Sequence, residues 1–191
     1  MNFRTVSVPK FLQILHGKET RLASIVLTYL GGLIGAAVSA FGLIQSSFPL
    51  WKICIFSAVM LDICGGVIAN LSSAANLYYQ ENRKIRLIFL AVHIFQPAVF
   101  AVLIPENAYY FITVFLVTFS SGLLIHFIRD IEQQQNLASF CIAAALPIFA
   151  LFALSSSVLY AFGPLYMLKL ILGFSVRRPS FLEKREDKKD C

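Results

Sequence analysis

The sequence consists of long apolar stretches separated by short polar ones. A helix that crosses a bilayer needs about 20 mainly apolar residues, because each residue rises about 1.5 Å and the hydrocarbon core is about 30 Å thick. The pattern therefore predicts an all-α, polytopic integral membrane protein with a bundle of six transmembrane helices. The stretches that meet or nearly meet this length are residues 22–44, 53–71, 87–104, 109–128, 139–154 and 158–176.

The last two stretches are divided only by three serines at residues 155–157. A single helix through both would have roughly 37 residues and a length of about 55 Å, which is too long for one crossing. Two crossings joined by a tight turn are therefore predicted. Pro147 and the pair Gly163-Pro164 are expected to break these two helices, because proline cannot donate a backbone hydrogen bond.

The basic residues test this division independently, because lysine and arginine concentrate in cytoplasmic segments within about 15–20 residues of the spans. With six spans and a cytoplasmic N-terminus, only Lys52 falls on the outer side, and Lys169 lies inside the sixth span. Five spans would place the basic tail on the wrong side, so we predict that both termini are cytoplasmic. The basic residues on the cytoplasmic side are Arg4, Lys10, Lys18, Arg21, Arg83, Lys84, Arg86, Arg129, Arg177, Arg178, Lys184, Arg185, Lys188 and Lys189.

Three regions follow from these boundaries. Residues 1–21 form a cytoplasmic segment, residues 22–176 the transmembrane domain, and residues 177–191 a charged cytoplasmic tail that is expected to be disordered. An interfacial helix is expected in the first region between Pro9 and Gly17, because apolar residues recur there at helical spacing. These residues are Val8, Phe11, Leu12 and Leu15.

Composition agrees with a membrane protein. Hydrophobic residues make up 58% of the chain and charged residues 14%, whereas a soluble domain has about 45–50% apolar and about 25% charged residues. This leaves no room for a separate soluble catalytic domain. The net charge of +6 is explained by the one-sided basic residues, so the lipid bilayer is the expected partner, nucleic acid is not, and the cell (plasma) membrane is the expected location.

Polar residues inside the apolar stretches carry the functional information, because a charge at the bilayer centre costs about 2.5–3.5 kcal/mol. Asp62 lies near the middle of the second stretch, with Gly66 and Ser73 on the same helical face and Asn70 beside them. Such a stripe is typical of a cavity or ion path. It is equally typical of a helix interface in which small residues pack closely and amides bond to neighbours.

Other polar residues at lipid depth lie in later stretches. The third contains His93, Gln96 and Pro97, and the proline is expected to free the carbonyl of His93 and to kink the helix. His126 lies near the cytoplasmic end of the fourth. The long side chain of Lys169 can reach the inner interface or Asp62, and we predict an ion pair between these two residues.

The leading hypothesis is a small proton- or cation-coupled transporter. Counted from the cytoplasmic helix ends, His126 lies roughly 5 Å deep, His93 about 10 Å and Asp62 about 15 Å, which suits a graded path. The residues assigned to the path are Asp62, Gly66, Asn70, Ser73, His93, Gln96 and Lys169.

Two other functions stay open. One is a membrane-embedded enzyme that acts on a lipid, with Asp62, His93 and His126 as acid/base groups or metal ligands. The other is a non-catalytic assembly subunit, in which polar residues specify helix contacts. No cofactor is predicted apart from a metal at those three residues in the enzyme alternative. The small-residue face of the first stretch predicts close helix packing or a homo-oligomer, and its members are Gly31, Gly35 and Ser39.

Overall fold

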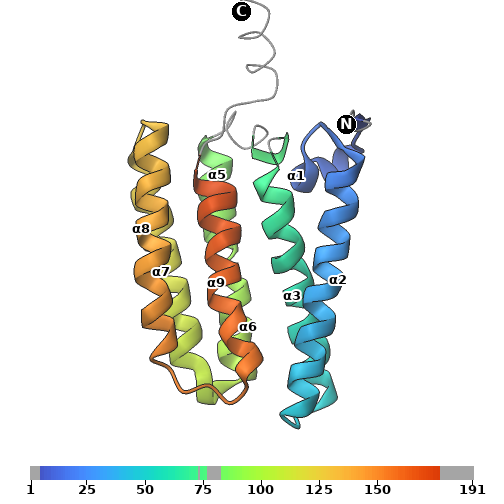
Figure 1. The fold of residues 1–191 in the computed structure, drawn as a ribbon, viewed down its shortest axis with the longest axis vertical. Helices are drawn as coiled ribbons and strands as arrows, with labels where there is room; N and C mark the ends of the chain where they lie inside the picture. The colour runs from blue at the N-terminus through green and yellow to red at the C-terminus, as the bar shows by residue number, and fades with distance from the viewer. Residues whose placement is uncertain (1–4, 73, 77–82, 177–191) are drawn as a thin grey trace, which may run out of the picture.

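The structure, a computed structural model, describes residues 5–72, 74–76 and 83–176. In this part of the chain the fold is all-α apart from one small two-stranded sheet. Helical segments stand side by side and run in alternating directions (Figure 1). They are α2 (Leu22–Gln45), α3 (Leu50–Leu71), α5 (Arg83–Val92), α6 (Phe95–Leu103), α7 (Ala108–Phe127), α8 (Ile131–Ala150), α9 (Phe162–Met167) and the π-helix η4 (Leu168–Ser175), with short 3-10 helices η2 (Pro105–Asn107) and η3 (Ser157–Ala161).

Three helices in the described residues are long and apolar enough to cross a membrane. They are α2, with 24 residues, α3, with 22, and the 23-residue segment Pro105–Phe127 that joins η2 to α7. Their boundaries lie within a few residues of the predicted ones, because long apolar runs in a membrane satisfy their backbone groups only as helices. The membrane character predicted from the sequence is confirmed to this extent.

The fifth predicted helix begins earlier than expected. Apolarity alone predicted a start at residue 139, whereas α8 begins at Ile131. Asp130 caps the helix, since its Oδ1 accepts a hydrogen bond of 2.8 Å from the backbone N–H of Gln133. Gln134 is fully buried and its Nε2 donates to the carbonyl of Ile128 at 2.7 Å, so the polar first turns belong to the helix.

The two predicted helix breaks have different outcomes. Pro147 lies inside α8, which continues to Ala150, so the predicted break there is wrong. Proline inside a membrane helix is tolerated where neighbouring groups satisfy the freed carbonyl. Gly163 and Pro164 lie inside α9, whose start at Phe162 directly follows the end of η3 at Ala161, so the change of helix type comes just before the predicted position. The proline is in the first turn of α9, where an N–H would have no helical partner.

The N-terminal segment folds back over one end of the bundle. Strand β1 (Thr5–Ser7) pairs antiparallel with β2 (Glu19–Arg21), and between them lie η1 (Lys10–Leu12) and α1 (Gln13–His16). Pro9 precedes this helical segment and Gly17 ends it, as predicted. Gly17 has a φ of 76°, and a Cβ there would clash with the backbone of Ala74. The three-residue strands are too short to have been found from an alternating pattern.

The small-residue face of α2 packs against α3 of the same chain. A Cβ added at Gly31 would clash with Ile68, and one at Gly35 with Cys64. Ser39 on the same face is 2% exposed. Close packing of this face is therefore confirmed, and it is used within the chain, while oligomer formation stays a prediction.

Candidate functional site

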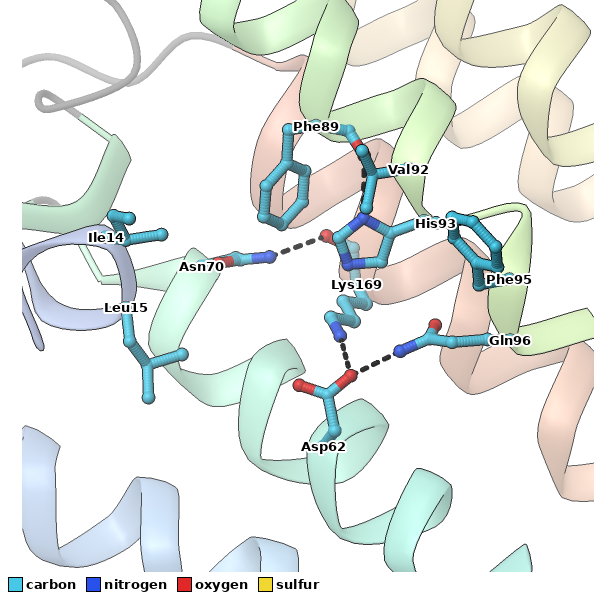
Figure 2. A pocket seen from close by; sticks show the side chains of 10 residues that line it. All are labelled: Ile14, Leu15, Asp62, Asn70, Phe89, Val92, His93, Phe95, Gln96 and Lys169. Carbon is cyan, nitrogen blue, oxygen red and sulfur yellow. Dashed lines mark hydrogen bonds and ion pairs between the residues drawn. The ribbon is translucent and has the colours of Figure 1, made fainter. Parts of the chain in front are cut away.

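A cavity of about 360 Å³ lies between α3, the junction of α5 and α6, and η4, with α1 along one side. Figure 2 shows side chains from all four segments pointing into it. The carboxylate, amides, imidazole and ammonium group that line it come from α3, the α5–α6 junction, α6 and η4, and the rest of the lining is apolar. The lining residues are Ile14, Leu15, Asp62, Asn70, Phe89, Val92, His93, Phe95, Gln96 and Lys169.

An ion pair between Asp62 and Lys169 forms the polar centre of the cavity. Lys169 Nζ lies 2.6 Å from Asp62 Oδ2, which confirms the predicted pair. Gln96 Nε2 donates to the same carboxylate oxygen. The lysine side chain is 3% exposed and the aspartate side chain 53%. The pair is therefore asymmetric: a buried cation depends on a carboxylate that is open to the cavity.

Gly66 makes room for the lysine. It lies one helical turn after Asp62 on α3, and a Cβ there would clash with Lys169 Cε and approach Cδ to 3.0 Å. The stem of Lys169 therefore crosses α3 at the position where α3 has no side chain. Gly66, which the sequence pattern places on the same helix face as Asp62, thus leaves the space that the Lys169 side chain needs.

Two asparagines hold the π-helix that carries Lys169. Asn70 Nδ2 donates to the carbonyl of Lys169 at 3.4 Å. Asn76 Nδ2 donates to the carbonyls of Gly173, at 3.2 Å, and Val176, at 3.0 Å. In a π-helix the backbone hydrogen bonds are rearranged, and such turns are frequent at functional sites. Asn70 of the polar stripe and Asn76 after it therefore act as helix contacts that support the ion pair.

His93 lies at the break between α5 and α6. Its Nδ1 is 2.7 Å from the carbonyl oxygen of Phe89, and because a carbonyl only accepts, Nδ1 carries a hydrogen. In the neutral imidazole, Nε2 is then the acceptor, and no hydrogen bond from the described residues occupies it. The helix is interrupted here, between Val92 and Phe95, as Pro97 led us to expect. The carbonyl of His93, to which Pro97 cannot donate, accepts from the backbone N–H of Gln96 at 3.3 Å and from the hydroxyl of Tyr166 at 2.9 Å.

Hydrogen-bond acceptors remain unused in this cavity. Gln96 Oε1 is buried without a partner among the described residues. Asp62 Oδ1 has no partner in the same part of the chain, and Figure 2 shows it pointing away from Lys169 and Gln96. Together with Nε2 of His93, these acceptors have no partner among the described residues, whereas Nζ of Lys169 and the amide nitrogens of Asn70 and Gln96 each donate a hydrogen bond. The site is therefore suited to a ligand that donates hydrogen bonds or carries positive charge.

Aromatic side chains fill the bundle between the cavity and the end opposite the N-terminal segment. Phe100 is fully buried on α6 and stacks on Phe56 of α3, with ring centroids 4.2 Å apart. Phe111 and Phe162 contact Phe100 edge to face at 5.3 and 5.0 Å. Phe56 comes six residues before Asp62 on α3 and Phe100 four residues after Gln96 on α6, while Phe111 and Phe162 lie near the starts of α7 and α9. The cavity is thus backed by a tightly packed aromatic layer.

Most of the residues predicted for the path come together here. His126, which the enzyme alternative requires, lies near the end of α7 and is absent from the cavity lining. In the described part of the chain no three histidine, cysteine or acidic side chains are grouped to hold a metal ion, so His126 does not join Asp62 and His93. Ser73 lies outside the described residues. The path residues found together are Asp62, Gly66, Asn70, His93, Gln96 and Lys169.

Two features of the site were missed from the sequence. Tyr166 lies three residues before Lys169, on the same side of the helical segment, and this spacing was a signal that it faces the same region. Ile14 and Leu15 belong to the short helix α1, and nothing in the local pattern connects that helix with Asp62.

None of the protein-family models, curated proteins or solved structures with which the chain was compared matches it. A functional proposal for this chain rests on the residues and geometry of the cavity.

Proposed function

We propose that this protein crosses the plasma membrane six times, with both termini in the cytoplasm, and exchanges protons for a cationic substrate. The cavity is the substrate site, Asp62 is its binding carboxylate, and Lys169 is the group that couples binding to proton movement. One observation carries this proposal: a nearly fully buried ammonium group shares one carboxylate with an open cavity that holds unused acceptors.

Charge balance supplies the mechanism. An unpaired buried charge costs several kcal/mol, so the site is stable with one positive charge beside Asp62 and unstable with two. A cation that binds the Asp62 carboxylate from the cavity side displaces the ammonium group of Lys169. Lys169 is then a buried charge without a partner, and it releases its proton. Reprotonation of Lys169 reverses the exchange and releases the cation. His93, whose Nε2 is an acceptor in the same cavity, is the proposed relay for this proton.

The shape of the bundle supports a cavity in the cytoplasmic half of the membrane. The N-terminal segment and the ends of α7 and η4 lie at one end of the bundle (Figure 1), and this is the end that the basic residues assign to the cytoplasm. The aromatic layer around Phe100 closes the other half. Transport requires this layer to open, and the α5–α6 break and the π-helix η4 are the irregular elements beside the ion pair that can rearrange.

The enzyme alternative is less well supported. It needs His126 to act with Asp62 and His93, whereas His126 does not line the cavity. An assembly role explains the contacts of Asn70 and Asn76, but it gives no reason for an open cavity beside a buried lysine.

Flux measurements on proteoliposomes test the proposal. Purified protein is reconstituted with a pH-sensitive dye inside, and the internal pH is followed after external addition of inorganic or organic monovalent cations. We expect cation-dependent proton movement with the wild type and its loss with Asp62→Asn. Lys52→Met is the matched control, because Lys52 lies on the same helix at the opposite end. Equal proton movement in wild type and Asp62→Asn would show that the carboxylate is not part of the path.

A further inference from the structure

We infer that the cavity binds an amphipathic organic amine, that is, a protonated amino group on an apolar body, which enters from the bilayer. This inference rests on the proposed function and names its substrate class. It follows from three properties of the cavity: its unused acceptors, its apolar walls and its exposed rim.

The unused acceptors match an ammonium group. A primary ammonium carries three N–H donors. Asp62 Oδ1 offers a charged acceptor and His93 Nε2 a neutral one, and neither has a partner in the described chain. Lys169 already satisfies the other carboxylate oxygen in this way, so the carboxylate is shown to accept an ammonium group in this environment.

The same set is poorly suited to a small inorganic cation. Calcium takes about 6–8 oxygen ligands, and potassium filters replace the hydration shell with rings of carbonyl oxygens. Here the unused side-chain oxygens of the lining are only three, on Asp62, Asn70 and Gln96, and half of the lining residues are apolar. The ring of Phe95, which also lines the cavity, offers a face that attracts an organic cation.

The rim of the cavity is apolar and exposed. Val92 is 52% exposed, Phe95 68% and Ile14 57%, and the Asp62 side chain between them is 53% exposed. In a bilayer, an opening between α3 and the α5–α6 junction at the depth of Asp62 faces lipid. A ligand can therefore place its ammonium on Asp62 while its apolar part lies against the rim. A volume of about 360 Å³ accommodates such a molecule.

Binding is coupled to release of one proton. Before binding, Lys169 is an ammonium ion paired with the Asp62 carboxylate. The incoming protonated amine pairs with the carboxylate instead, and Lys169 becomes a neutral amine as its proton passes to solvent. One positive charge enters the site and one leaves, so the net charge beside α3 is unchanged.

Titration calorimetry on the full-length protein in detergent tests both the recognition of an ammonium group and the release of a proton on binding. Octylamine is the probe and octanol is its neutral partner of equal chain length. Titration in two buffers with different protonation enthalpies gives the number of protons released. We expect octylamine to bind about tenfold to hundredfold more tightly than octanol, the range that a charged hydrogen bond supplies, with release of about one proton.

Three variants separate the roles. Asp62→Asn is expected to lose the preference for octylamine. Lys169→Met retains the length of the stem beside Gly66 and is expected to bind octylamine at least as tightly as the wild type, without proton release. Lys52→Met is expected to match the wild type in both measurements.

The opposite results overturn the inference. Equal binding of octanol and octylamine, or an unchanged preference in Asp62→Asn, would mean that the cavity does not recognise an ammonium group. Unchanged proton release in Lys169→Met would remove the coupling role of the lysine. Asp62-dependent flux of sodium or potassium without octylamine binding would refute the substrate class and leave the proposed function standing. Absence of both flux and binding would refute both.

Discussion

The unequal burial of the central ion pair predicts unequal effects of its two neutralising variants. Asp62→Asn leaves the ammonium of Lys169 in a position where its side chain is 3% exposed. Lys169→Met leaves the Asp62 carboxylate, whose side chain is 53% exposed and can be hydrated from the cavity. The first variant creates an unpaired buried charge, and the second creates a solvated one.

The expected magnitudes follow from this difference. Removing one partner of a buried pair costs about 3–5 kcal/mol, and we expect about 3 kcal/mol for Asp62→Asn because the asparagine oxygen still accepts a hydrogen bond. For Lys169→Met we expect a smaller loss than for Asp62→Asn, because the carboxylate that remains borders the open cavity and not the protein interior. The double variant Asp62→Asn/Lys169→Met contains no unpaired charge and is expected within about 1 kcal/mol of the wild type.

Thermal unfolding in one detergent, followed by circular dichroism, measures these differences. At about 2–4 °C per kcal/mol for a chain of this size, Asp62→Asn is expected to lower Tm by about 6–12 °C, and the second substitution to restore most of that loss. Lys52→Met, near the start of α3, controls for the same substitution at a lysine outside the ion pair. Equal losses in the two single variants, or additive losses in the double variant, would refute the asymmetric pair.

Three further variants test the surroundings of the pair and the N-terminal segment. Gly66→Ala places a methyl group against the stem of Lys169 and is expected to destabilise the protein by about 1–3 kcal/mol; an unchanged Tm in detergent would contradict the steric role of Gly66. Tyr166→Phe removes the 2.9 Å bond to the carbonyl of His93 and is expected to cost about 1 kcal/mol, measured as the shift of the unfolding midpoint. Burial lowers the pKa of His16 from 6.5, so the unfolded chain binds more protons than the folded one as pH falls through the unfolded value, and stability is lost below about pH 6.5. His16→Phe is expected to reduce that acid-induced loss of Tm, and equal pH profiles for variant and wild type would contradict it.

The helices were largely predictable because their cause is local. An apolar run in a membrane forms a helix whatever its neighbours are, since every backbone group must be satisfied within the segment. The start of α8 was missed because apolarity was the criterion, although Asp130 followed by Gln133 is a readable capping pattern. The hairpin of β1 and β2 was missed because its strands have three residues each and its stability comes from packing.

The sequence by itself identified which residues are chemically unusual. Asp62, His93 and Lys169 stand out because polar groups at lipid depth are costly, and cost depends on residue type and position along a helix. The break beside His93 was likewise predictable from Pro97, because proline has no backbone N–H to donate to the carbonyl four residues earlier. Each of these inferences uses only the residues of a single helix and requires no knowledge of how the helices pack.

Only the tertiary structure decided how these residues act together. Asp62 and Lys169 are separated by 107 positions, and no periodicity relates residues on different helices. Packing of η4 against α3 at Gly66 sets which of the two charges is buried, and the contact with Phe89 leaves His93 Nε2 as an acceptor. The closure of one side of the cavity by α1 also depends on how the N-terminal segment folds back, because contacts between distant segments arise only when the whole bundle is assembled.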